Sequence, residues 1–72
     1  MKKMVIEYYA NGKIRSVKNY LNGKLHGPYI TYDDRGKKKY RDNFKNGSLF
    51  GEYEIWEGGK KYIYKYENDY LG

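Results

Sequence analysis

The sequence lacks cysteine altogether and contains one proline and one histidine among its 72 residues. Without cysteine there is no disulfide framework and no thiolate metal site, which fits a reducing compartment. No apolar run approaches the ~20 residues of a membrane-spanning helix, and the first residues lack the apolar run of a signal peptide. These absences predict a cytoplasmic location.

Groups that carry catalysis are equally scarce. His26 is the only histidine, and Ser16 and Ser48 are the only serines. His26 occupies a motif position that Phe50 takes in a second copy, which favours a structural role over general-base chemistry. We therefore expect no enzymatic activity, no cofactor, no metal site and no catalytic residue.

Tyrosine and lysine dominate what the chain does contain. It has 11 tyrosines and a net charge of +6. Residues 1–45 hold 12 Lys or Arg against 4 acids, whereas residues 46–72 hold 3 against 5. The basic front suggests an acidic partner, which is a nucleic acid, an anionic lipid or an acidic protein patch. A second explanation has equal weight. Lysine is encoded by AT-rich codons, so part of the positive charge can reflect the base composition of the genome rather than a partner.

Turn signals recur along the chain and are separated by strand-length stretches rich in Tyr, Ile and Val. They are Asn11-Gly12, Asn22-Gly23, Asp33 to Gly36, Asn46-Gly47, Gly58-Gly59 and Asn68-Asp69. Short loops of this composition connect antiparallel strands, and no segment has a useful helical period. The predicted fold is all-β, a single-layer twisted antiparallel meander of about six strands built from β-hairpin repeats.

Two-residue loops also predict the register, because the residues that flank the loop become partners. The pairs expected around Gly58 and Gly59 are Ile55 with Tyr62, Tyr53 with Tyr64, Gly51 with Tyr66, Glu52 with Lys65 and Trp56 with Lys61. Those expected around Asn46 and Gly47 are Phe44 with Leu49, Tyr40 with Tyr53, Arg41 with Glu52 and Lys39 with Glu54. Towards the N-terminus we expect Tyr20 with Leu25, Tyr9 with Ile14 and Tyr29 with Tyr40.

This register gathers large side chains on one face. The predicted face carries Val5, Tyr9, Ile14, Tyr20, Leu25, Tyr29, Tyr40, Phe44, Leu49, Tyr53, Ile55, Tyr62, Tyr64 and Tyr66. Gly51 is expected to let the Tyr66 ring lie across its backbone. With no helix to cover this face, a partner should dock there. The predicted partner-binding residues are Tyr29, Tyr40, Phe44, Tyr53, Tyr62, Tyr64 and Tyr66.

A basic patch is the second candidate site. It comprises Lys13, Arg15, Lys37, Lys38, Lys39 and Arg41. Cations interleaved with an aromatic suit nucleic acid. The expected pairing of Lys39 and Arg41 with glutamates, and of Lys37 with Trp56, favours a solvated basic strand instead. Unpaired edge strands at residues 4–10 and 60–67 are further docking candidates.

Two stretches carry a recognisable pattern, which reads Tyr8-Tyr9-Ala10-Asn11-Gly12-Lys13 and Tyr20-Leu21-Asn22-Gly23-Lys24-Leu25-His26-Gly27. They resemble the bacterial variant of the MORN repeat, and residues 45–53 are similar except at Ser48 and Phe50. We interpret residues 1–72 as one MORN-like domain with approximate repeats 7–27, 28–51 and 52–72. The resemblance implies an open sheet of hairpins and a non-enzymatic scaffold that binds proteins or, in some members, acidic phospholipid. Some bacterial proteins of this kind are described as antitoxins.

The leading hypothesis is a bacterial or phage protein-binding module, an antitoxin, immunity protein or phage-type inhibitor, that blocks a larger bacterial protein. It would act through the aromatic face and the basic front. One alternative is nucleic-acid binding by basic strands and stacked tyrosines. Another is attachment to anionic membrane through Lys2, Lys3, Lys13, Arg15 and Lys18. A homodimer through the aromatic face or a strand edge is compatible with all three.

Overall fold

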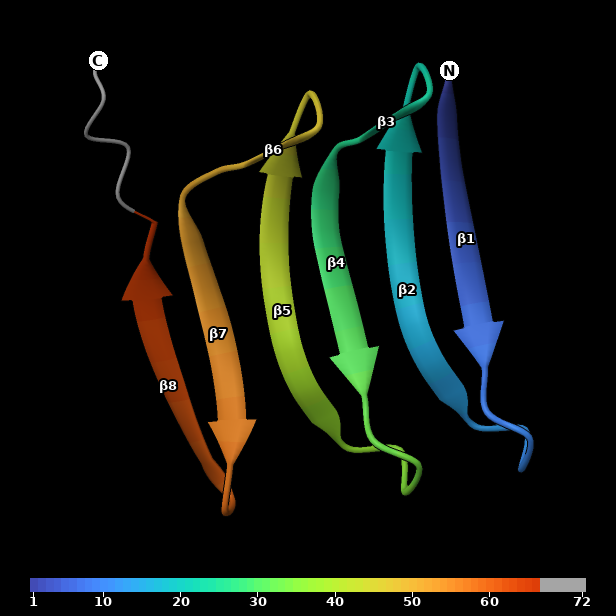
Figure 1. The fold of residues 1–72 in the computed structure, drawn as a ribbon, viewed down its shortest axis with the longest axis vertical. Helices are drawn as coiled ribbons and strands as arrows, with labels where there is room; N and C mark the ends of the chain where they lie inside the picture. Colours follow the sequence, from blue (N-terminus) through green and yellow to red (C-terminus); the bar gives the residue numbers. More distant parts are fainter. Residues whose placement is uncertain (67–72) are drawn as a thin grey trace.

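The computed structural model describes residues 1–66 and contains strands only. The strands are β1 (Lys2–Tyr8), β2 (Ile14–Leu21), β3 (Lys24–Leu25), β4 (Gly27–Tyr32), β5 (Lys38–Lys45), β6 (Ser48–Leu49), β7 (Glu52–Glu57) and β8 (Lys60–Lys65). Six of them form an antiparallel meander in the order β1-β2-β4-β5-β7-β8, while the short β3 and β6 pair with β2 and β5 (Figure 1). The predicted all-β meander is confirmed. The expected turn at Asn68-Asp69 lies outside the described residues.

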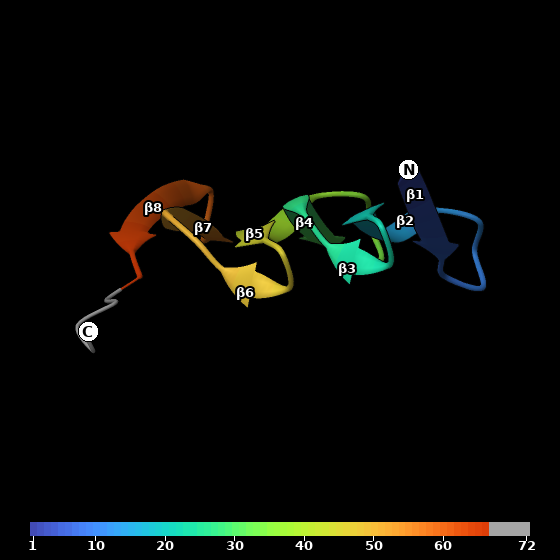
Figure 2. The ribbon, with the colours of Figure 1, turned by 90° about the horizontal axis from the view of Figure 1, so that it is seen from above.

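The sheet is one layer thick. Its extents are 43 × 33 × 12 Å, and Figure 2 shows the long strands following one another in a single row, with the short β3 and β6 bending out of it and no second layer covering it. Within residues 1–66 no hydrophobic side chain is buried, and the one buried polar residue is Ser16, which is 4% exposed. The strands are therefore held together by main-chain hydrogen bonds and by contacts between neighbouring side chains on two open faces.

The last hairpin has the predicted register. Ile55 pairs with Tyr62, Tyr53 with Tyr64, Glu52 with Lys65 and Trp56 with Lys61. Gly58 and Gly59 both have positive φ angles, of 59° and 77°, which the tight connection requires and glycine adopts without steric cost. The Tyr66 amide donates to the Gly51 carbonyl at 2.9 Å, as the expected pairing of these two residues implies.

Beyond its turn, the hairpin between β5 and β7 departs from the prediction. Phe44 pairs with Leu49 as expected, but the predicted pairs of Tyr40 with Tyr53, Arg41 with Glu52 and Lys39 with Glu54 are wrong. Tyr40 pairs with Ile55 instead, and Arg41 pairs with Glu54. The cause is a bulge at residues 50–51, where the Phe50 amide donates to the Asn43 carbonyl at 2.9 Å and Gly51 has φ 81°.

The same arrangement occurs between β2 and β4. The His26 amide donates to the Asn19 carbonyl at 2.8 Å, and Gly27 has φ 103°. The Asn19 side-chain amide then donates to the Pro28 carbonyl at 2.8 Å. Asn43 makes the equivalent bond to Glu52. Each bulge inserts two residues into one strand, and because side chains alternate with a period of two, the predicted faces survive although the partners change.

Two further predicted pairs are wrong because of the loops at the other end of the strands. Tyr29 pairs with Asp42 rather than Tyr40, because the ladder shifts where Thr31 pairs with Tyr40 and Tyr32 with Lys38. The pairing of Tyr9 with Ile14 is likewise replaced by Tyr8 with Ile14. Both loops are five-residue turns, closed by amide-to-carbonyl bonds of 2.8 Å from residue 9 to 13 and from residue 33 to 37.

The expectation that a ring lies across Gly51 is also wrong. A Cβ atom placed on Gly51 would meet no atom within 4 Å, whereas the φ of 81° is one that side chains of L-residues rarely adopt. The glycine is needed for its backbone conformation at the bulge, not for space.

Replacing Gly51 with alanine should therefore lower the free energy of unfolding by about 1–2 kcal/mol through backbone strain alone. Gly51→Asn should lower it less, because asparagine tolerates the left-handed region better than alanine does. Urea unfolding followed by circular dichroism measures both changes. Equal stability of Gly51→Ala and the unmodified protein would contradict this role of the bulge.

Candidate functional site: an aromatic sheet face

The seven predicted partner-binding residues lie on one face of the sheet. Strand alternation and the observed register place them together, and ring contacts involve five of them. Tyr53 stacks on Tyr64 with 5.3 Å between ring centroids and contacts Tyr66 at 4.8 Å. Tyr29 and Phe44 form a second pair at 6.0 Å. We call the surface formed by Tyr29, Tyr40, Phe44, Tyr53, Tyr62, Tyr64 and Tyr66 the aromatic face.

Tyr9 is held by contacts of its own. It precedes the first turn, and its hydroxyl donates to the Tyr32 carbonyl at 2.6 Å. Its ring is covered by Arg15, whose guanidinium carbon lies 5.9 Å from the ring centroid. Tyr9 therefore connects the first hairpin to the second, and this contact was not predicted from the sequence.

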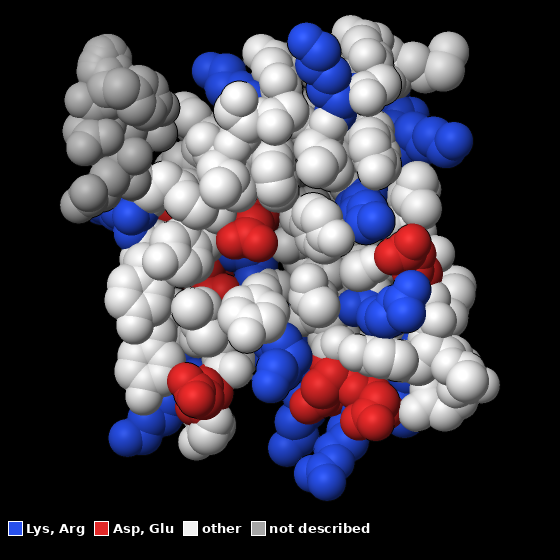
Figure 3. Space-filling view, viewed as in Figure 1, with Lys and Arg blue, Asp and Glu red and all other residues white. Residues whose placement is uncertain are grey.

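Three large side chains of the aromatic face are substantially open to solvent. Tyr40, Tyr62 and Tyr64 are 45%, 42% and 46% exposed. A space-filling view of one side of the sheet shows mostly uncharged side chains over its middle, with many of the Lys and Arg side chains at the strand ends (Figure 3). Tyrosine tolerates such exposure, since its hydroxyl stays hydrated while the ring keeps apolar area available to a partner.

A small polar cluster on the same face was not predicted. The register places Glu7, Ser16 and Lys18 on the side that carries Tyr29. Ser16 donates to the Glu7 carboxylate at 2.8 Å, and the Lys18 ammonium lies 3.6 Å from it. The Ser16 hydrogen bond, followed by the charge of Lys18, holds the pKa of Glu7 below its ordinary value. No sequence motif marks this cluster, and only the register brings its members together.

Asp42 was also missed. It pairs with Tyr29 across the strands, and its carboxylate accepts a hydrogen bond of 2.7 Å from the Tyr66 hydroxyl. Partial burial, and then the adjacent carboxylate, raise the pKa of the Tyr66 phenol, which keeps it a neutral donor. This bond fixes the ring at the edge of the aromatic face.

The predicted basic patch is divided in the structure. Arg41 makes an ion pair of 3.0 Å with Glu54 on the opposite face from the tyrosines, and Arg15 lies over Tyr9. The side chain of Lys13 lies beside the turn at Gly36. Lys37, Lys38 and Lys39 stay together near the β4–β5 turn and line a common hollow. Lys38 rather than Lys37 lies over Trp56, so the predicted contact of Lys37 is wrong.

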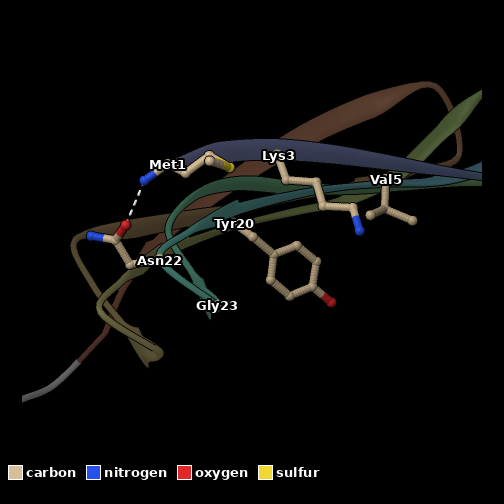
Figure 4. A pocket seen from close by; sticks show the side chains of 6 residues that line it. All are labelled: Met1, Lys3, Val5, Tyr20, Asn22 and Gly23. Carbon is tan, nitrogen blue, oxygen red and sulfur yellow. Dashed lines mark hydrogen bonds between the residues drawn. The ribbon is translucent and has the colours of Figure 1, made fainter.

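A second hollow lies where β1 meets the end of β2. Met1, Lys3, Val5, Tyr20, Asn22 and Gly23 line it. Figure 4 shows the Lys3, Val5 and Tyr20 side chains on the same side of the sheet, with the Met1 amine donating to the Asn22 side chain. Since Lys3 and Tyr20 are cross-strand partners, the hollow extends the open surface toward β1.

His26 and Asp33 are polar residues whose hydrogen bonds hold the loops together. The His26 Nδ1 atom accepts a hydrogen bond of 3.3 Å from the Asn46 amide, which connects the β3 and β6 hairpins. The Asp33 carboxylate accepts from the Arg35 and Lys37 amides, and these bonds lower its pKa. In residues 1–66 no group of three His, Cys, Asp or Glu side chains is placed to hold a metal ion.

Comparison with known proteins adds no relative. No protein-family model, curated protein or solved structure matches the chain. The described residues include no helix of the length and apolarity that a membrane crossing needs.

The Glu7 cluster makes a prediction about pH. Because the folded-state pKa of Glu7 lies below its ordinary value of 4.5, the stabilising effect of this carboxylate is present above pH 4.5 and is lost as pH falls through the folded pKa. In Ser16→Ala the pKa should move up toward 4.5, since the leading cause of the shift is removed. Carboxyl titration by NMR measures it. Ser48→Ala, far from Glu7, should leave the pKa unchanged, and an unchanged value in Ser16→Ala would contradict the assignment.

Proposed function

We propose that this protein is a non-enzymatic protein-binding module that blocks a larger bacterial protein through its aromatic face. An antitoxin, an immunity protein or a phage-type inhibitor acts in this way. The observation that carries the proposal is that the aromatic face has no second layer over it within residues 1–66. Sheets of ordinary domains bury their apolar face against another element. A partner protein would supply that missing layer.

The size and composition of the face support a protein partner. A stable protein interface takes about 800 Å² from each side, and a sheet with extents of 43 × 33 Å offers that area on one face. Tyrosine is enriched at interfaces because it adds a large contact area at a low cost in side-chain entropy. Ring contacts such as Tyr53 with Tyr64 hold parts of the face in place before a partner arrives.

The charge distribution supports an acidic partner. Residues 1–45 carry most of the 15 Lys and Arg side chains. On the tyrosine-bearing side Lys18 sits beside Tyr29, with its ammonium 5.6 Å from the ring centroid. Complementary charge accelerates association and selects among partners more than it adds affinity.

We also propose that the chain consists of MORN-like repeats at 7–27, 28–51 and 52–72. A cytoplasmic location is part of the same proposal. Residues 67–72 of the third repeat lie outside the described part of the chain. The bulges at Gly27 and Gly51, with matching bonds at Asn19 and Asn43, support two equivalent units. Binding to an anionic membrane and self-association are the alternatives from which the experiment below distinguishes protein binding.

Strand β8 provides a matched pair of variants. Tyr64 and Ile63 are neighbours with 46% and 51% exposure, but alternation directs them to opposite faces. Tyr64→Ala should weaken partner binding about ten-fold or more, as a hot-spot aromatic does, while Ile63→Ala should leave it unchanged. Tyr62→Ala provides a second test outside the stacked ring pairs.

The measurement is crosslinking and quantitative mass spectrometry in a bacterial lysate, followed by titration of the recovered protein. Circular dichroism checks that each variant folds. Equal recovery with Tyr64→Ala and Ile63→Ala would contradict binding through the aromatic face. Flotation with anionic vesicles, or a dimer in light scattering that Tyr64→Ala dissociates, would instead assign the face to a membrane or to a second copy.

A further inference from the structure

A hollow at the turn end of the sheet gathers four cations around the single tryptophan. The loop between β4 and β5 and the turn between β7 and β8 enclose it, and the lining side chains used here are Arg35, Lys37, Lys38, Lys39 and Trp56. Trp56 alternates with Ile55 along β7, so its ring lies on the side opposite the aromatic face. The hollow is thus separate from the proposed protein-binding surface.

The observed register leaves Lys39 without the glutamate partner that the sequence predicted. Lys39 was expected to pair with Glu54, but the bulge at residues 50–51 gives that glutamate to Arg41, at 3.0 Å. The ion pairs within residues 1–66 join Arg15, Lys18 and Arg41 to glutamates, and none involves the four cations of the hollow.

Two acids, Asp33 and Glu57, also line the hollow. The Asp33 carboxylate accepts hydrogen bonds of 2.9 Å from the Arg35 and Lys37 amides, and these bonds stabilise the loop. Glu57 is the backbone register partner of Lys60 across the final turn. With four cations and two acids in its lining, the hollow keeps an excess of positive charge.

Trp56 adds a flat surface to this charge. The Lys38 ammonium lies 5.4 Å from the centroid of the indole ring. A cation at such a site is held weakly and stays mobile, so a planar group can replace it on the ring. The pair of Trp56 and Lys38 occurs once in the repeated hairpins. In the preceding unit Tyr32 takes the position of Trp56, and Ile14 takes the position of Lys38.

We infer that the hollow formed by Arg35, Lys37, Lys38, Lys39 and Trp56 binds nucleotide units of a single-stranded nucleic acid. Phosphates lie among the cations, and one base stacks on the indole ring. A single strand fits because its bases are free to leave the stack, whereas duplex bases are not. A run of four cations matches consecutive phosphates along a strand rather than one isolated anion.

Trp56 is the only tryptophan and so reports on the site directly. The intact chain is titrated with a short oligothymidylate at low salt while indole fluorescence is recorded. Quenching is expected, with an affinity that falls as salt rises. An abasic oligonucleotide of the same length has the same phosphates and should bind at least about five-fold more weakly, because stacking is lost.

Variants separate the site from general charge. Lys37→Gln with Lys39→Gln should reduce the slope of log affinity against log salt by about 1.4, since each phosphate contact of a single strand contributes about 0.7. Lys24→Gln with Lys45→Gln removes the same charge at the other end of the strands and should change the slope less. Measured by anisotropy of a labelled oligonucleotide, Trp56→Leu should weaken binding about five-fold or more and Trp56→Tyr should retain most of it.

Three results would overturn the inference. They are no quenching at low salt, equal affinity for the abasic strand, and equal losses in the two lysine pairs. Quenching by a polyglutamate peptide of equal charge that matches the oligonucleotide would reassign the hollow to acidic proteins. Because Tyr64→Ala leaves this hollow untouched, failure here is distinguishable from failure of the aromatic face.

Discussion

The hydrogen-bonded ladder between neighbouring strands is the constraint on which this molecule depends. Residues 1–66 form one layer with no buried hydrophobic side chain, so no core holds the strands from above or below. Cross-strand contacts such as Arg41 with Glu54 and Tyr53 with Tyr64 add about 0.2–1 kcal/mol each. A sheet stabilised in this way leaves both faces available, and their chemistry can diverge without loss of the fold.

The two sides have diverged. One side gathers seven aromatic residues with Asp42 and Lys18 among them, and it suits a protein that supplies a second layer. The other places Trp56 beside a cluster of cations at the turn end. These surfaces use different residues on different elements. The proposed protein partner and the proposed nucleic-acid strand would therefore occupy different surfaces, one over the strands and one next to the turns.

The bulges explain which predictions survived. At Gly27 and Gly51 two residues leave the ladder, so every later pair in the hairpin changes partner while each side chain keeps its face. The seven residues of the aromatic face were therefore predictable from alternation alone. Pairs that depend on the exact offset, such as Lys39 with Glu54, were not predictable. A glycine with a positive φ angle shifts the ladder only if the amide of the preceding residue donates to a carbonyl of the neighbouring strand. The His26 and Phe50 amides do so, to Asn19 and Asn43.

Turn chemistry and the two-residue period of strands determined, by themselves, the all-β meander, its strand order and the gathering of tyrosines on one side. These properties are local, since each follows from a few adjacent residues. Only the tertiary structure decided that Asp42 accepts the Tyr66 hydroxyl, that Lys38 lies over Trp56 and that Lys39 lacks a glutamate partner in the described chain. Each of those contacts joins residues from different hairpins or depends on the accumulated offset between strands, which no single stretch of sequence specifies.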